Sequence, residues 1–447
     1  MPEVIETGPD TPVRNPAWHY ARAEEKRATG DELAALAHLI AAQTLDSYAA
    51  NPALASARAL CDVATGYFMK GDRQTAAYWY RLVLALDPRM AVPYQNLAAI
   101  YDGMGRQAEA DACRQQAYKI QRVFVDEVGT PAHRVLVLCT GQAAGNIGFE
   151  VLLPTRTFAR IKYAIDFAAE EEDGALPPFD LVFNAIGEPD IAARLDERLR
   201  RFALNCDRPL LNAPQAVIET QRQRLPGLLA ELEGVVAPAC IRSDQAPGAG
   251  GDRARQLAEA GLAFPLLARP AAAHGGAGLV RCDNVEALDA WLGQMQGEFY
   301  LTAFHDSADA AGYYRKYRMI CIGGQAFPYH LAISRDWMVH YFSADMERHP
   351  WKVEEERRFL ADPAAVLGKR AINAIAGIGQ RLWLDYGGID FTVLPDGRVL
   401  VFEANATMLV HPERNDGPLA HKNVYVERIV AAFGQMLADR RQTLPGQ

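Results

Sequence analysis

An acidic hairpin near the C-terminal end carries the residues whose types and spacing best suit chemistry. Two β-rich runs, 387–394 and 399–405, flank an Asp-Gly pair that favours a tight turn. The resulting register places Asp390 opposite Glu403, and Asn405 follows two residues later on the same strand face. Two carboxylates and an amide are therefore expected on one side of the hairpin.

Two ionised carboxylates at this cross-strand separation of roughly 5 Å repel by about 3 kcal/mol at an effective dielectric of ~20. A hairpin selected only for stability would avoid the pair. Two carboxylates and an amide oxygen form a hard-oxygen donor set, which suits Mg²⁺ and leaves positions for water and phosphate oxygens. The alternative is a solvent-facing strand edge with incidental acids.

The other face of the hairpin is predicted to be core. The same register places Phe391 opposite Phe402 and Val393 opposite Leu400.

A glycine-rich segment, 270–278, lies between two predicted strands, 262–269 and 278–282, and directly follows Arg269. The backbone amides of such a loop can fold over phosphate oxygens, although the segment alone fits a surface hairpin tip equally well. This loop, Arg318 on a later strand and the acidic hairpin are three parts that together suit one nucleotide site. The candidate residues of the loop are His274, Gly275, Gly276 and Gly278.

Composition narrows the class of protein. The 447-residue chain has room for roughly three domains. Its formal net charge of −9 gives no electrostatic footprint for nucleic acid or an anionic membrane. Its 7 cysteines are scattered without C-x-x-C spacing, which argues against disulfides and zinc. No apolar run approaches the ~18 residues that span a bilayer, and no signal pattern opens the chain, so we expect a cytoplasmic protein.

The N-terminal part is helical and repetitive. Tyr67, Gly71 and Ala76 recur as the same residue types 34 residues later. This period is typical of tetratricopeptide repeats, and three helical hairpins suffice for a stable stack. The stack offers a concave surface for a peptide or partner protein, or alternatively a dimerisation or packing module.

Beyond residue 131 the sequence resembles the ATP-grasp superfamily, in particular glutathione synthetases, D-alanine:D-alanine ligases and ribosomal-protein glutamylating ligases. The matching stretches are Phe179–Glu188, Leu211–Pro214, Pro265–Pro270 with its glycine loop, Tyr317–Arg318, and Gly388–Asp390 with Glu403–Asn405. The acidic hairpin is the most specific of these.

The repeats and the resemblance together predict a multidomain protein, with an all-α tetratricopeptide-like N-terminal domain followed by an α/β pre-ATP-grasp domain and an α+β ATP-grasp domain. The predicted division is a disordered N-terminus at 1–14, helical repeats at 15–130, a pre-ATP-grasp domain at 131–215, a lid subdomain at 216–298 and a C-terminal subdomain at 299–440.

The resemblance also implies roles for the candidate residues. Asp390, Glu403 and Asn405 would hold two Mg²⁺ ions, with Mn²⁺ as an alternative, on the phosphates of ATP. Arg318 would neutralise the transferred phosphoryl group, and 274–278 would close over the triphosphate. ATP would phosphorylate a carboxylate, and an amine would then displace the phosphate. Catalysis would rest on positioning and charge neutralisation.

The sequence departs from the family pattern at two places. The two lysines that usually contact ATP are missing, because no lysine lies between Lys162 and Lys316. Arg222 or Arg224 and Arg269 stand near those positions, and arginine is not a neutral exchange for lysine. The usual hinge acid is also missing, and the uncharged stretch 301–304 stands in its place. These departures bear on nucleotide choice more than on metal binding.

A substrate pocket is harder to predict. The candidate residues for it are Gly145, Glu188, His330, Arg335, His411 and Arg414. We expect an ATP- and Mg-dependent carboxylate–amine ligase acting on small or peptide substrates, with the repeats recruiting a peptide or protein or forming a homodimer. The alternatives are an inactive nucleotide-responsive scaffold and a phosphotransferase on the same fold.

Overall fold

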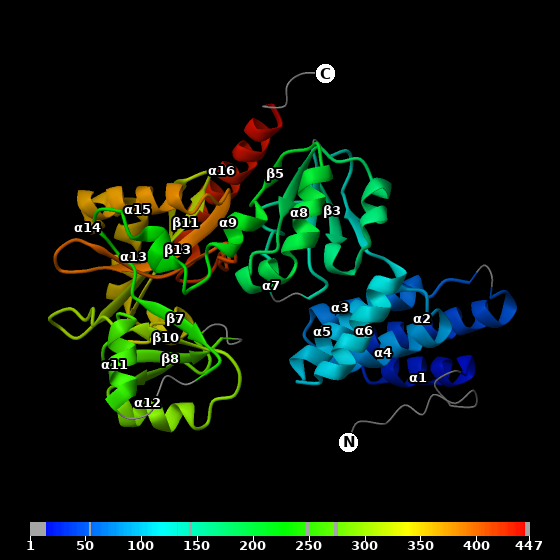
Figure 1. Ribbon diagram of the computed structural model, residues 1–447. Coiled ribbons are helices and arrows are strands. Elements are labelled where there is room, and N and C mark those ends of the chain that lie inside the picture. The colour runs from blue at the N-terminus through cyan, green and yellow to red at the C-terminus, as the bar shows by residue number, and fades with distance from the viewer. Residues whose placement is uncertain are drawn as a thin grey trace. The chain divides into compact units, whose positions relative to one another are not determined.

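The computed structural model has a mixed α/β fold (Figure 1). It describes residues 15–52, 55–131, 133–142, 145–245, 251–271 and 276–442. The segment 1–14, predicted to be disordered, and the loop residues His274 and Gly275 lie outside the described residues. The chain divides into two compact units: the first holds 1–124 with two short segments, 141–143 and 164–169, and the second holds the remainder. The finer five-part division stays a prediction.

The described part of the first unit contains six helices. They are α1 (Pro16–Ala28), α2 (Glu32–Ala50), α3 (Arg58–Met69), α4 (Arg73–Leu86), α5 (Ala91–Gly103) and α6 (Gln107–Ile120). Neighbouring helices pack as three antiparallel pairs. Gly71 and Gly105, which are 34 residues apart, both take a positive φ, +82° and +71°, just before the second helix of their pairs. Helical hairpins are therefore present, and their identity as tetratricopeptide repeats stays a prediction.

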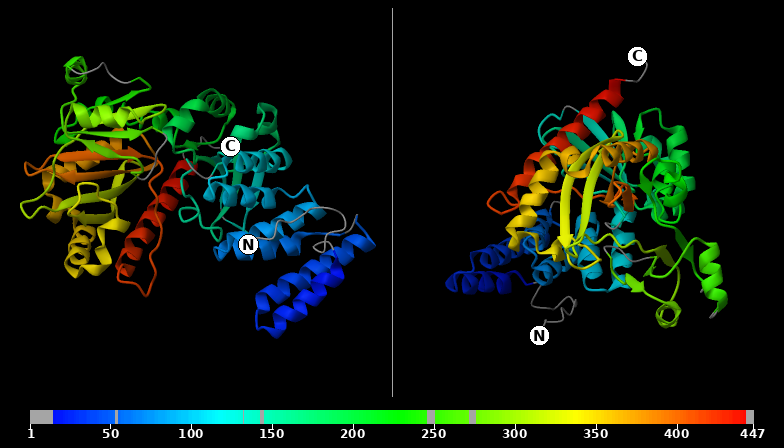
Figure 2. Two further views of the ribbon diagram at one scale, coloured as in Figure 1. Left: turned by 90° about the horizontal axis from the view of Figure 1, so that it is seen from below. Right: turned by 90° about the vertical axis from the view of Figure 1, so that its left-hand side faces the viewer.

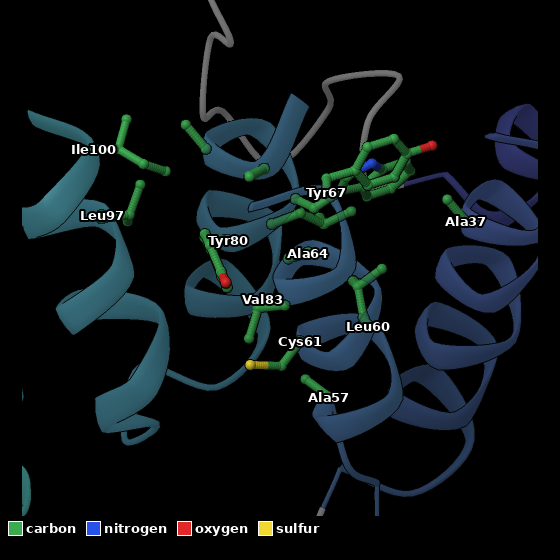
Figure 3. Packing of buried hydrophobic residues seen from close by; sticks show 14 of the residues in the cluster. Ala37, Ala57, Leu60, Cys61, Ala64, Tyr67, Tyr80, Val83, Leu97 and Ile100 are labelled. Carbon is green, nitrogen blue, oxygen red and sulfur yellow. The ribbon is translucent and has the colours of Figure 1, made fainter. Parts of the chain in front are cut away.

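The core of this unit lies between the helix pairs (Figure 3). Leu60 and Ala64 of α3, Tyr80 of α4 and Ile100 of α5 are fully buried there. The Tyr80 hydroxyl donates to Thr65 Oγ1 at 3.0 Å and accepts from Asn96 Nδ2 at 2.6 Å. Its polar atom is thus satisfied inside an apolar interface.

A five-stranded sheet of order β1-β3-β2-β4-β5 follows. Its strands are β1 (Val123–Asp126), β2 (His133–Cys139), β3 (Phe158–Ala164), β4 (Leu181–Asn184) and β5 (Leu210–Leu211), with α7 (Pro189–Arg194), α8 (Asp196–Asn205) and α9 (Pro214–Ile218) beside them. Strands β2, β4 and β5 are parallel, and the register sets Val135 beside Leu181. The short β-rich runs 133–139, 179–183 and 209–212 predict these three strands, whereas β1 and β3 are not predicted.

A second sheet has the order β7-β10-β8-β9 and is antiparallel. Its elements are β7 (Cys240–Ser243), β8 (Leu266–Pro270), β9 (Val280–Cys282), β10 (Phe299–Ala303), α11 (Gly251–Glu259) and α12 (Val285–Leu292). Leu257 of α11 and Leu288 of α12 pack on Leu266 and Phe299, so both helices cover one face of this sheet (Figure 1). The Asn284 side chain caps α12 by accepting from the backbone N–H of Ala287.

The third sheet has the order β12-β11-β13-β14-β6. Its strands are β6 (Val235–Val236), β11 (Tyr314–Ile322), β12 (Gln325–Ser334), β13 (Tyr386–Val393) and β14 (Val399–Asn405), and its helices are α10 (Leu225–Leu229), α13 (Pro350–Ala361), α14 (Pro363–Leu367), α15 (Lys369–Arg381) and α16 (Asn423–Gln442). Helix α16, red in Figure 2, packs against β11 and β12. Within the described residues, no helix combines the length and apolar composition that crossing a membrane needs.

The acidic hairpin forms as predicted at its centre and differs on one side. Asp390 pairs with Glu403, which confirms the predicted register there. A β-bulge then shifts the register, so that Phe391 pairs with Val401 instead of Phe402. Phe402 is the extra residue, and it turns away from the core, with 38% of its surface exposed. The predicted pairs of Phe391 with Phe402 and of Val393 with Leu400 are therefore wrong.

Candidate nucleotide and metal site

Four registered residues form a row across the third sheet. His330 of β12 pairs with Arg318 of β11, Arg318 with Asp390 of β13, and Asp390 with Glu403 of β14. Side chains at registered positions project from the same face and lie close together. Register shifts follow the row directly, after Arg318 and after Asp390, and such bulges re-aim side chains next to functional sites.

Asp390 is held by two cations. Arg318 donates from Nε to Oδ1 at 2.5 Å and from Nη2 to Oδ2 at 2.9 Å, and Lys316 Nζ lies 3.1 Å from Oδ2. Only 4% of the Asp390 side chain is exposed. Burial by itself raises the pKa of this carboxyl, but the charge and hydrogen bonds of Arg318, with Lys316, hold it well below its usual range. Asp390 is therefore ionised at every physiological pH.

Glu403 has a different environment. Its side chain is 34% exposed, and Oε1 lies 2.9 Å from Arg222 Nη2 and accepts from Asn405 Nδ2 at 2.6 Å. Burial and the charge of Asp390 raise the pKa of Glu403, whereas the charges of Arg222 and Arg318 lower it. The two arginines have the larger effect, so the pKa lies below its usual value. The Asn405 amide oxygen in turn accepts from Thr407 Oγ1 at 3.1 Å.

The donor chemistry of Asp390, Glu403 and Asn405 fits Mg²⁺. All three supply hard oxygens, and they come from two registered strands. No group of three or more His, Cys, Asp or Glu side chains within the described ranges is arranged to hold a metal ion. Two carboxylates do not complete a metal site by themselves, so an ion held here would need further oxygen ligands, such as phosphate or water, and Lys316 and Arg222 would have to give way to it.

Two cavities meet at the charged residues. The larger, of about 190 Å³, has apolar walls that include Leu267, Phe304, Met338, Leu400 and Phe402. The smaller, of about 70 Å³, is lined mainly by polar groups, and these include Glu188, Thr220, Tyr300, Asn405 and Thr407. Arg222, Arg269 and Glu403 line both cavities. We call this trio the junction.

The junction is rich in positive charge. Arg269 is buried, and both its burial and the neighbouring charge of Arg222 lower its pKa. Lys316 lines the larger cavity as well. With Arg318, four cations thus lie around Asp390 and Glu403, whose two charges neutralise only two of them. An anionic ligand at this place gains from the excess.

Gly276 of the glycine-rich loop approaches the wall of the larger cavity. Its φ is +80°, and a Cβ built on it would lie 2.4 Å from His340 Nε2. Both Gly276 and His340 line the cavity. Gly278 also takes a positive φ of +67°. The positive φ of Gly276 and Gly278 therefore favours glycine at both positions, and a Cβ at Gly276 would also force the His340 ring or the backbone to shift.

Two further predicted residues lie at the site. Glu188 lines the smaller cavity, and its backbone N–H donates to the Gly145 carbonyl at 3.0 Å. Gly145 has a φ of +93°, and a Cβ there would lie 2.4 Å from Ile191 Cδ1. Gly145 thus positions the backbone that carries Glu188.

His330 shares the row with Arg318 but is buried and stacks on Tyr341 with ring centroids 4.7 Å apart. Burial, with the charge of Arg318, holds the pKa of His330 well below its usual value. The imidazole is therefore neutral. It borders the site without lining either of the two cavities.

Three predicted substrate residues lie elsewhere. Arg335 covers the Tyr313 ring at 4.4 Å, His411 contacts the Tyr329 hydroxyl at 3.1 Å, and exposed Arg414 pairs with Asp416. In the described part of the chain, all three are absent from the walls of both cavities.

Sequence reasoning missed Lys316, Phe402 and His340. Lys316 had a usable signal, since it lies two residues before Arg318 and thus on the same face of the strand. Phe402 reaches the cavity only because of the bulge. His340 belongs to a loop after β12 whose path has no sequence signal that we recognise.

Comparisons with known proteins give structural similarities only. No protein-family model matches the chain, and no curated protein matches its sequence. Similar solved structures include D-alanine–D-alanine ligase from Bacillus anthracis complexed with ATP, at 13% identity over 70% of this chain and 100% of that chain, with a TM-score of 0.41. A RimK domain ATP-grasp protein from Sphaerobacter thermophilus has 14% identity over 69% and 99%, with a TM-score of 0.41.

The ATP-grasp ligase PsnB, complexed with a phosphomimetic variant of its minimal precursor, Mg and ADP, has 13% identity over 69% of this chain and 100% of that chain, with a TM-score of 0.41. Similarities this low do not establish a function for this chain. We therefore infer its function from the residues of the site.

Proposed function

We propose that the protein is an ATP- and Mg²⁺-dependent carboxylate–amine ligase that acts through an acyl phosphate, as its resemblance to ATP-grasp enzymes implies. The junction is the observation that carries the proposal. Arg222, Arg269 and Glu403 stand there between an apolar and a polar cavity, and Asp390, which pairs with Glu403, adds a second carboxylate with its partners Lys316 and Arg318. This combination suits a ligand with an apolar ring at one end and a metal-bound polyphosphate at the other.

The larger cavity would take the base. Its apolar walls bury a flat ring, and Leu267 and Leu400 come from different sheets, so a base can lie between them. The backbone N–H groups of Ala303 and Phe304 already donate to Ala239 and Pro265. These N–H groups already have acceptors within the protein, so other groups of the cavity would have to recognise the base.

The junction would hold the phosphates. Arg222, Arg269 and Lys316 are close enough to the cavity to bind phosphate oxygens, and Arg318 stays fixed by its two bonds to Asp390. Asp390, Glu403 and Asn405 would hold Mg²⁺, whose chemistry there is to offset phosphate charge. No protein nucleophile is needed, because the substrate carboxylate attacks the terminal phosphoryl group.

The smaller cavity would take the reacting carboxylate and amine. Arg222 and Arg269 favour a carboxylate, and Glu188, which lines the same cavity, favours an ammonium group. The helical hairpins of the first unit would recruit a peptide or protein that carries one of these groups. Dimerisation through the same hairpins is the other role for them.

A nucleotide-responsive scaffold without turnover is the second candidate. It is favoured by the ion pairs of Asp390 and Glu403, since cations already occupy the carboxylates that would hold the metal. It would bind Mg–ATP and release no product.

The two candidates separate in a turnover assay. Purified protein is incubated with Mg–ATP and panels of carboxylates and amines, and ADP and phosphate are measured. A ligase releases both products only when a carboxylate and an amine are both present. Binding without turnover over the whole panel favours the scaffold, and a stable phosphorylated product identifies a phosphotransferase.

A further inference from the structure

The carboxylates of the site are neutralised by protein groups. Asp390 accepts both hydrogen bonds of Arg318 and also contacts Lys316, and Glu403 contacts Arg222 and Asn405 Nδ2. A divalent cation that binds without phosphate must approach carboxylate oxygens that these three positive side chains already contact. Repulsion between like charges a few ångströms apart opposes its binding.

The three cations are not held equally. Arg318 makes a two-point bond to Asp390 with both partners largely buried. Lys316 and Arg222 each make one contact, at 3.1 and 2.9 Å, and both line the larger cavity. Both side chains are long and flexible enough to turn from a carboxylate to a ligand in that cavity.

We propose that Lys316 and Arg222 leave the carboxylates for phosphate oxygens when a polyphosphate enters, and that only then does the site bind its metal. Lys316 thereby becomes a phosphate-binding residue. The Asn405 amide turns from Glu403 at the same time and offers its oxygen. This inference rests on the proposed function, because it takes a nucleotide phosphate chain as the natural ligand of the junction.

The exchange follows from charge. A polyphosphate supplies several negative oxygens, which accept the two released cations and also ligate the metal. Asp390 then regains the lone pair of Oδ2 that Lys316 held, while Arg318 keeps its two bonds, and Glu403 regains the lone pair of Oε1 that Arg222 held. Metal and phosphate bind with positive coupling, and each raises the affinity of the other by the same factor.

The test measures Mn²⁺ binding to the full-length protein by equilibrium dialysis, with and without inorganic tripolyphosphate on both sides of the membrane. Because tripolyphosphate equilibrates across the membrane, excess Mn²⁺ in the protein chamber reports bound metal. We expect Mn²⁺ affinity to rise at least about tenfold with tripolyphosphate, a coupling of about 1.4 kcal/mol. The ATP analogue AMPPNP should give the same direction.

Arg222→Met gives the sharper result, because exchange predicts opposite effects on two affinities. Mn²⁺ alone should bind more tightly, since Glu403 loses its cation, and tripolyphosphate should bind more weakly. Arg224→Met is the matched control, because Arg224 lies two residues away and pairs with Glu219 on the surface; neither affinity should change. Lys316→Met should likewise weaken tripolyphosphate binding, and it serves if Arg222→Met does not fold.

Two outcomes overturn the exchange and leave the proposed nucleotide site standing. In the first, wild-type protein binds Mn²⁺ equally well with and without tripolyphosphate. In the second, the Arg222→Met variant loses affinity for both Mn²⁺ and tripolyphosphate, as a structural role of Arg222 predicts. Wild-type protein that binds neither tripolyphosphate nor AMPPNP in the presence of Mn²⁺ overturns the exchange and the proposed nucleotide site together.

Discussion

Arg318 and Asp390 form a two-point ion pair across β11 and β13, with N–O distances of 2.5 and 2.9 Å. Asp390 of this pair lies opposite Glu403 of the junction, and its side chain is only 4% exposed. A rigid, desolvated pair of this kind fixes the position of both groups. It also sets how the site responds to substitution.

Asp390→Asn is expected to destabilise the protein. It leaves Arg318 and Lys316 without their shared counter-charge, and removing one partner of a buried pair costs about 3–5 kcal/mol. Glu403→Gln is the matched control, because Glu403 is a third exposed and its partner Arg222 is exposed to a similar degree. It should cost less than about 1 kcal/mol. Urea unfolding followed by tryptophan fluorescence measures both, and equal losses would contradict the assignment of Asp390 as the buried anchor.

Gly276→Ala is expected to weaken nucleotide binding by about tenfold. The new methyl group meets the His340 ring at the cavity wall, so either that ring or the backbone at Gly276 must shift and the cavity changes shape. Gly297→Ala is the control, because Gly297 also has a φ near +80° but has no atom within 4 Å of a built Cβ. Both variants share the backbone strain, so only Gly276→Ala should alter the nucleotide dissociation constant, measured by calorimetry. Equal effects would point to strain alone.

Phe402→Ala tests the bulge. Phe402 lines the cavity and is partly exposed, so its loss should raise the nucleotide dissociation constant by about tenfold and hardly change the unfolding midpoint. Val401→Ala should lower the unfolding midpoint and hardly change the nucleotide dissociation constant, because Val401 is 1% exposed and pairs with Phe391. We expect it to lower the free energy of unfolding by about 1–3 kcal/mol. Calorimetry and thermal unfolding separate the two, and a swapped pattern would place Phe402 in the core.

The centre of the hairpin could be predicted because strand alternation and a tight turn fix which residues lie opposite each other. The pairing of Asp390 with Glu403 follows from these two rules alone. The bulge at Phe402 could not be predicted, because one extra residue in a strand depends on how that strand meets its neighbours. The sequence rules therefore placed the acids correctly and put Phe402 on the wrong face.

The cation partners of the acids illustrate the same limit. Arg222 and Arg269 were expected near a polyphosphate from their position along the chain, and the structure brings both to the junction. The direct contacts between the acids and their cations join three strands and a turn that are distant in sequence. The ion pairs of Asp390 and Glu403 with Arg318 and Arg222 are long-range relationships of this kind.

Asp166 of the first unit predicts a pH dependence. Burial raises the pKa of Asp166 from 3.8 to about 6. Hydrogen bonds from backbone N–H groups, which include that of Gly141, act in the opposite direction and are outweighed. The folded state therefore binds this proton more tightly than the unfolded state, and stability falls as pH rises from 3.8 to about 6. Asp166→Asn should remove this fall, so its thermal midpoint should exceed the wild-type value more at pH 7 than at pH 4. The same difference at both pH values would contradict the raised pKa.

The path of one oxygen atom tests the ligase proposal most directly. Carboxylate substrates labelled with oxygen-18 are pooled with amines, Mg–ATP and purified protein, and the released phosphate is analysed by mass spectrometry. An acyl phosphate requires the carboxylate oxygen to leave with the phosphate, so each phosphate should carry one labelled oxygen, and only when an amine is present. Phosphate released without label, or no phosphate despite nucleotide binding, would contradict the account.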